Sequence, residues 1–408
     1  MSDFDRYRNA LLQESHLKGP DLTNSLPPND TFVINRNPSE QYSYPKPLWN
    51  REDELTLRRY IGSGVAFVSL ITENLLSHPF LVLRRQCQVN PTSKKYHLVP
   101  FTLLPTIYHL QQRQGLTTLW KGLGSVLLVR GMTLGIEDVI SKLTPWPAEI
   151  NVNSSLKQFF QHTLLKCLSL AIVTPFYSAS FVETVQSEIA SERPGILDVF
   201  KEGFIRLLYW KAPAKGRMLP IWALIVPTIS LGLSKYIFSM LIKGISDRML
   251  NSRHKEKWEE TGAIPKNTVA ITQDINFTAS LIAAIASDVA FYPCETIVHR
   301  LHLQGTRTII DNLSDGRSVL SILTNYTSAT DCYEKCVACE GVAGLYKGFG
   351  ALILQYLLHI ALIKLTRLVL SEIGEFWKKP KLKERGSFGH SPPPIYNITN
   401  PPDSYLLP

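Results

Sequence analysis

The stretch Glu-Gly-Val-Ala-Gly-Leu-Tyr-Lys-Gly at residues 340–348 decides the fold of this chain. It places an aromatic residue five positions after a glycine and follows it with Lys-Gly, and residues 115–122 repeat that pattern. A worn third copy at residues 203–211 ends in Tyr-Trp-Lys and lacks the final glycine. Matches at a period of roughly a hundred residues indicate a chain built from three repeats.

Each copy follows a proline near the C-terminal end of an apolar stretch. These residues are Pro79, Pro175 and Pro293. Because proline removes a backbone hydrogen bond, we expect a helix kink at each of them.

Six apolar stretches are each close to the roughly 20 residues that span a bilayer. Charged residues such as Lys235 and Asp288 interrupt them, and charges inside spans usually face a bundle interior or a water-filled cavity. Buried helices of a soluble scaffold remain an alternative for each stretch alone, but six in succession favour a membrane protein. The stretches are residues 60–83, 123–142, 157–181, 217–242, 276–299 and 349–372.

The composition places flexible segments at both ends of the chain. Residues 1–55 are polar and rich in proline, and residues 375–408 form a second Pro-rich segment, so we expect both to be disordered. The net charge of +9 suits nucleic acid or an anionic membrane surface, but no nucleic-acid-binding motif is present. Asp3, Asp5 and Glu14 interrupt the basic residues that a mitochondrial presequence needs, so targeting is expected to be internal.

The body of the chain, residues 56–374, resembles the mitochondrial carrier family. The resemblance implies an all-α membrane protein with the mitochondrial carrier fold: six transmembrane helices in three pseudo-repeats with short surface helices. The repeats are expected at about 56–145, 155–245 and 272–374, and residues 331–335 are similar to one of the family's surface helices.

The family carries Pro-x-Asp/Glu-x-x-Lys/Arg on each odd helix, and the three acid–base pairs form a ring that closes one side of a cavity. Only Arg84 and Glu295 remain here as a residual gate. The other four positions carry Leu81, Tyr177, Ser180 and Val298. A full ring cannot form, so we expect a protein that does not exchange solutes; the alternative is an atypical carrier for an unknown metabolite.

With its lost charge pairs and its long polar N-terminal extension, the chain resembles one subgroup of the family, the outer-membrane carriers associated with mitochondrial dynamics. This resemblance implies a multi-pass adaptor in the mitochondrial outer membrane. It also implies roles in fission and fusion balance, cristae organisation and lipid supply from the endoplasmic reticulum. The implied partners are mitochondrial fusion GTPases and the cristae-organising complex.

The loop from residue 84 to residue 121 carries six basic residues and no acidic one, which suits anionic lipid head groups. The family holds cardiolipin at helix N-termini beside its aromatic-Lys-Gly segments, where backbone N–H groups and the helix dipole favour a phosphate. A basic loop that only sets topology is the alternative. The implied lipid-binding residues are Trp120, Lys121, Gly122, Tyr346, Lys347 and Gly348.

Two smaller motifs remain. Pro393, Pro394 and Tyr396 form a Pro-Pro-x-Tyr segment of the kind that WW domains bind, although such tetrapeptides also arise by chance. Cys332, Cys336 and Cys339 would share one helical face but lack a fourth metal ligand, so helix packing is the better interpretation than a metal site. Neither a catalytic constellation nor a cofactor motif occurs, so the sequence does not support an enzyme.

Overall fold

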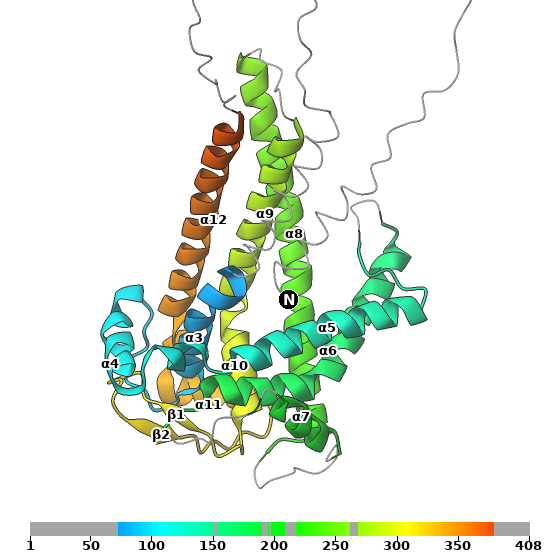
Figure 1. Ribbon diagram of the computed structural model, residues 1–408. Coiled ribbons are helices and arrows are strands. Elements are labelled where there is room, and N and C mark those ends of the chain that lie inside the picture. Colours follow the sequence, from blue (N-terminus) through cyan, green and yellow to red (C-terminus); the bar gives the residue numbers. More distant parts are fainter. Residues whose placement is uncertain are drawn as a thin grey trace, which may run out of the picture. The chain divides into compact units, whose positions relative to one another are not determined.

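The computed structural model describes residues 72–150, 154–189, 195, 197–208, 218–261 and 268–378, and these residues are mostly helical (Figure 1). The first part contains a π-helix (Thr72–Leu76), α3 (His78–Val89), α4 (Leu104–Gln114), α5 (Leu123–Leu143), α6 (Leu156–Val185) and α7 (Asp198–Leu208). The second part contains α8 (Ile221–Thr261), α9 (Thr268–Ala290), α10 (Tyr292–Leu303), β1 (Ile309–Asp311), β2 (Val319–Ser321), α11 (Ala329–Glu340) and α12 (Phe349–Lys378). Short 3-10 helices occur at Pro100–Thr102, Leu116–Trp120 and Val342–Tyr346.

The described residues up to Ile363 belong to one compact unit, and a second unit begins at Lys364 inside α12. Most of the first predicted span, residues 60–71, lies outside the described residues, as does the Tyr-Trp-Lys of the second repeat.

Three helices among the described residues are long and apolar enough to cross a membrane. They are Leu156–Val185, Ile221–Lys257 and Val342–Leu365. The pair Ile275–Ala290 and Tyr292–Leu303, bent by 62°, provides a fourth if it is one broken span. Helix α5 covers the stretch predicted at 123–142 but is not among these spans.

The two intact copies of the aromatic-Lys-Gly pattern adopt the same local structure. In each, a helix ends at a glycine with positive φ, Gly115 or Gly341, and a 3-10 helix follows. A second positive-φ glycine, Gly122 or Gly348, then begins the long helix α5 or α12. Because side chains other than glycine rarely adopt this backbone conformation, the glycine spacing fixes both turns.

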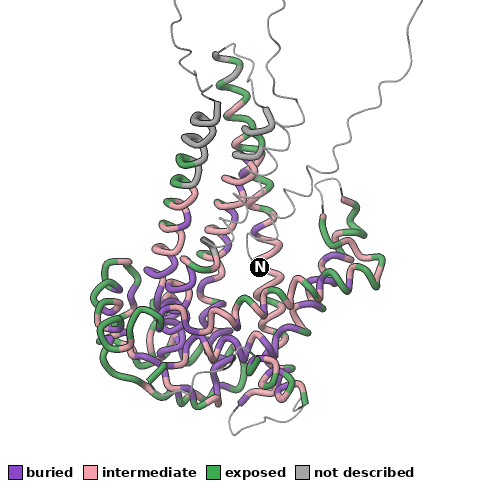
Figure 2. The backbone as a smooth tube through the Cα atoms, viewed as in Figure 1, coloured by how far each residue is buried: buried purple, intermediate pink, exposed green. Residues whose placement is uncertain are grey.

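Helices α3, α6 and α10 contact one another pairwise, and buried residues gather where they meet (Figure 2). Phe181 and Val185 at the end of α6 pack with Val89 of α3 and Leu303 of α10, and none of the four is more than 1% exposed. The antiparallel hairpin of β1 and β2 joins this cluster through Ile310. The hairpin therefore lies at the point where three helices from distant parts of the sequence converge.

Candidate functional site: buried ion pairs that join distant segments

The two residues predicted as a residual gate lie together in the structure. The guanidinium Nη2 of Arg84, on α3, lies 3.2 Å from Oε1 of Glu295, on α10. Pro79 and Pro293 stand in the first turns of these two helices. Pro175, in contrast, lies inside α6, which continues through it as one helix.

A second cation completes this pair. Lys235 of α8 places its ammonium 2.5 Å from Oε2 of Glu295 and 3.0 Å from Oδ1 of Asp288 on α9. The hydroxyl of Tyr356, on α12, donates to Oδ2 of Asp288 at 2.7 Å. The network therefore ties five helices together through buried or half-buried charges, although the family's full ring of acid–base pairs is missing.

Other charges within the helices are also paired. The ammonium of Lys166 on α6 lies 2.6 Å from Oε2 of Glu137 on α5, and both side chains are buried. Charged residues inside the apolar stretches therefore serve helix–helix pairing in this part of the structure.

Asp311, at the end of β1, is the centre of a second network. Its buried carboxylate accepts hydrogen bonds from the ammonium of Lys121 at 2.9 Å and from Nε2 of Gln86 at 3.0 Å. Nε2 of Gln114 and the hydroxyl of Ser187 also donate to it, at 2.8 and 2.6 Å. Burial disfavours the ionised carboxylate, but the Lys121 ammonium and the hydrogen bonds from Ser187 and Gln114 outweigh it and lower the pKa of Asp311.

The hairpin is also joined to α6 through the backbone. The amide of Ser187 donates to the carbonyl of Ile309 at 2.8 Å, and Gln186 forms a β-bridge with Ile310. The sequence does not single out Asp311, because an isolated acid between helices shows no sign of the four donors that surround it. Only the packing of the surrounding segments brings these donors together.

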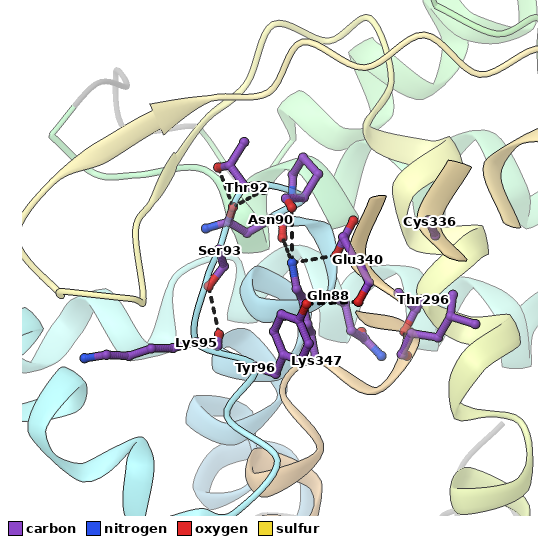
Figure 3. Close-up of polar contacts among 12 residues, drawn as sticks. Gln88, Asn90, Thr92, Ser93, Lys95, Tyr96, Thr296, Cys336, Glu340 and Lys347 are labelled. Atoms are coloured by element: carbon purple, nitrogen blue, oxygen red, sulfur yellow. Dashed lines mark hydrogen bonds and ion pairs between the residues drawn. The ribbon is translucent and has the colours of Figure 1, made fainter. Parts of the chain in front are cut away.

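Lys347 belongs to a third network (Figure 3). Its ammonium lies 2.5 Å from Oε2 of Glu340 and donates to the backbone carbonyls of Asn90 and Pro91. The guanidinium of Arg300 forms a forked ion pair with the same Glu340 carboxylate. In this structure the side chain of Lys347 is fully buried, so its ammonium has no access to a lipid head group.

The N-terminus of α12 is capped by the chain itself. The amides of Gly348 and Gly350 donate to the carbonyls of Tyr96 and His97, both at 2.9 Å. A Cβ at Gly350 would lie 2.8 Å from the carbonyl oxygen of His97, so the two segments are in close contact. Peptide carbonyls thus satisfy two of the N–H groups that a phosphate would need at this helix end.

The first copy of the predicted lipid site is likewise engaged within the protein. Lys121 is buried in its pair with Asp311, Trp120 donates from Nε1 to the carbonyl of Leu75 at 2.7 Å, and Gly122 packs against Thr184. Lipid binding at these positions stays a prediction. In this structure the ammonium groups of Lys121 and Lys347 are both paired with carboxylates of the protein and do not face a lipid. The proposed WW ligand, Pro393, Pro394 and Tyr396, lies outside the described residues.

The predicted cysteine face is divided by burial. Cys332 and Cys336 are buried, with their sulfur atoms 3.9 Å apart, and Cys339 is exposed. The two buried thiols pack in an apolar cluster with Leu301 and Leu345. Among the described residues, no group of three or more His, Cys, Asp or Glu side chains has the arrangement of a metal site.

Comparison with known proteins agrees with this architecture. The family model "Mitochondrial carrier protein" matches residues 274–367. The chain is 44% identical over 323 residues to the mitochondrial outer membrane protein SLC25A46 of Gallus gallus, covering 78% of each chain. It is 44% identical over 317 residues to the protein of that name from Homo sapiens, covering 78% of this chain and 76% of the relative. It is 43% identical over 322 residues to the one from Danio rerio, covering 78% and 79%.

These relatives are named as membrane proteins of the mitochondrion and not as enzymes. With its apolar helices, the chain is a multi-pass protein of the mitochondrial outer membrane. The resemblance found in the repeats is thus confirmed: the chain belongs to the mitochondrial carrier family, as an outer-membrane member similar to the SLC25A46 proteins.

Proposed function

We propose that this protein is a non-transporting adaptor of the mitochondrial outer membrane. It controls the balance of mitochondrial fission and fusion, the organisation of cristae and the transfer of lipid from the endoplasmic reticulum. Its body has six transmembrane helices in three pseudo-repeats. Its partners are fusion GTPases, the cristae-organising complex and membrane lipids, including cardiolipin.

The observation that carries the proposal is the set of donors around Asp311. Three of them, Gln86, Gln114 and Lys121, come from the first predicted repeat, Ser187 follows α6 of the second, and Asp311 itself belongs to the third. Alternating access requires two states of similar free energy in which parts of the barrel move against each other. Separating these segments would leave buried charges without partners, at a cost of about 3–5 kcal/mol.

The network around Glu295 gives a second reason to expect that the helices do not move apart as alternating access requires. Glu295 contacts cations from α3 and α8 at once, so movement of α10 away from either helix breaks a buried ion pair. These contacts favour the one arrangement in which α3, α8 and α10 share Glu295. A protein held in this way presents surfaces to partners without cycling.

A transport assay tests the first half of the proposal. Purified full-length protein would be reconstituted into vesicles beside a working mitochondrial carrier as a positive control, and exchange of labelled nucleotides, carboxylates and amino acids would be measured. We expect no exchange above that of protein-free vesicles. Saturable, inhibitor-sensitive exchange would overturn the proposal in favour of an atypical carrier.

A cellular assay tests the second half. The tagged full-length chain would be crosslinked in intact mitochondria and compared with another multi-pass outer-membrane protein that carries the same tag. We expect enrichment of fusion GTPases and of the cristae-organising complex, together with altered mitochondrial length and cristae when the chain is removed. Equal recovery by both baits with unchanged mitochondrial shape would contradict the adaptor role.

A further inference from the structure

A cleft with a volume of about 430 Å³ opens between α4 and the turn that joins β1 to β2. His109, Gln112 and Arg113 of α4 line one part of it, and Arg317 of the turn lines the other. None of the four side chains is a carboxylate, so the lining carries no negative charge, and the two guanidinium groups can only donate hydrogen bonds. Such a lining suits an anion, and arginine recognises phosphate through two parallel N–H···O bonds.

Specific contacts hold the turn against α4. The carbonyl oxygen of Leu313 accepts hydrogen bonds from Thr106 on α4 at 3.1 Å and from His97 at 2.9 Å. Gly316 has a φ of 67°, and a Cβ there would lie 3.0 Å from the carbonyl oxygen of Thr106. Arg317 follows this close approach directly, so its backbone is fixed beside the helix that carries Arg113.

The acid nearest in sequence serves the turn itself. The carboxylate of Asp315 accepts from the backbone amides of Arg317 and Ser318, at 3.0 and 3.3 Å, and from the hydroxyl of Ser318. Burial raises the pKa of Asp315, but the hydrogen bonds from Arg317 and Ser318 together outweigh burial and lower it, and they keep the carboxylate oxygen atoms occupied within the turn.

An apolar surface borders the cleft on the same helix. Phe101, just before α4, is 76% exposed, and Leu104 and Tyr108 of α4 are 53% and 57% exposed. Gln112, which lines the cleft, donates to the Tyr108 hydroxyl at 2.8 Å, so the apolar and basic surfaces are continuous. Exposed apolar side chains beside basic ones are typical of segments that lie in the membrane interface.

We propose that this cleft binds the phosphate head group of an anionic phospholipid, whose acyl chains lie along Phe101, Leu104 and Tyr108. Arg113 and Arg317 bind the phosphate, and His109 and Gln112 supply further donors. Residues 84–121 contain no acidic side chain that would repel such a lipid. The site is separate from the buried lysines of the aromatic-Lys-Gly segments and does not depend on the adaptor proposal.

The test uses the purified full-length protein in a non-ionic detergent, with bound lipid counted by native mass spectrometry. Dioleoyl phosphatidic acid, dioleoyl phosphatidylcholine and inorganic phosphate are the three probes. We expect phosphatidic acid to bind in preference to phosphatidylcholine and Arg113→Gln/Arg317→Gln to weaken it at least about tenfold. The control Lys94→Gln/Lys95→Gln removes the same charge from two exposed residues outside the cleft and is expected to change binding less than about twofold.

A third variant separates lipid from free phosphate. Leu104→Gln is expected to weaken phosphatidic acid severalfold, because the acyl chains lose an apolar contact. Equal effects of the two double variants, or no preference over phosphatidylcholine, would overturn the proposal. The proposal would also be overturned if an equal concentration of inorganic phosphate displaced the lipid and Leu104→Gln had no effect. That result would show that the cleft binds free phosphate.

Discussion

The ammonium nitrogen of Lys121 lies 2.9 Å from a carboxylate oxygen of Asp311, a residue 190 positions further along the chain. Both side chains are at most 5% exposed. The pair links the end of a 3-10 helix to a β-hairpin, and Gln86 donates to the same carboxylate oxygen from α3. These contacts join the hairpin to the first third of the chain.

Asp311→Asn should destabilise the protein by about 3–5 kcal/mol, because it leaves the buried Lys121 ammonium without its counter-charge. Thermal unfolding of the full-length protein in detergent would measure the loss. The control Asp138→Asn removes a carboxylate from the exposed pair with Lys142 and should cost less than about 1 kcal/mol. Equal losses in the two variants would contradict the buried-pair account.

Adding Lys121→Met to Asp311→Asn should restore part of the lost stability. The double variant has no uncompensated buried charge, and the methionine fills much of the lysine's volume. A double-mutant cycle from the same unfolding data gives the coupling, which we expect to be favourable by more than about 1 kcal/mol. Strict additivity would mean that the two residues do not interact in solution.

Stability should also fall in acid through Asp311. Its pKa in the folded protein lies below the ordinary aspartate value, because the Lys121 ammonium and two further donors outweigh the effect of burial. The unfolded chain therefore binds a proton at a pH where the folded chain does not, and the stabilisation present above about pH 4 is lost as the pH falls through the folded value. Unfolding midpoints measured from neutral to acid pH should fall more steeply for the native chain than for Asp311→Asn.

The sequence indicated the charges of the Glu295 network but not all of their pairings. Arg84 and Glu295 stand at the spacing from Pro79 and Pro293 that the carrier family's motif has, and this local pattern is visible in the sequence. Lys235 carried only the general expectation that a charge within a span faces the interior. Its pairing with Glu295 depends on how α8 packs against α10, which no local pattern encodes.

For the buried lysines Lys121 and Lys347, the sequence predicts the local backbone but not the contacts of the side chain. Aromatic-Lys-Gly predicts a helix start correctly, because glycine and the preceding 3-10 turn are local features. It does not reveal what the lysine contacts. Lys347 pairs with Glu340, which is close to it in the sequence. Lys121 pairs with Asp311, which only folding of the chain brings beside it.

Gly316→Ala should loosen the hairpin from α4. The residue has positive φ, and an added Cβ would lie 3.0 Å from a backbone oxygen and 3.1 Å from Cβ of His109. We expect a loss of about 1–3 kcal/mol in thermal unfolding. Gly131→Ala is the matched control, because a Cβ in that helical position meets nothing within 4 Å and should be neutral or stabilising by about 0.5–1 kcal/mol.

Lys347→Gln distinguishes a structural lysine from a lipid ligand. The variant leaves Glu340 with Arg300 alone and leaves the carbonyls of Asn90 and Pro91 without their cationic donor, so we expect a loss of about 2–4 kcal/mol in thermal unfolding. Retained anionic lipid, counted by native mass spectrometry on the protein that remains folded, should be unchanged, because the ammonium is enclosed by protein acceptors. The control Lys335→Gln removes a cation from the surface helix α11, where it pairs with Asp331 in an exposed i,i+4 contact, and should affect neither quantity by much. Loss of bound lipid with unchanged stability in Lys347→Gln would instead assign the lysine to a head group and would show that the enclosed arrangement opens when lipid is present.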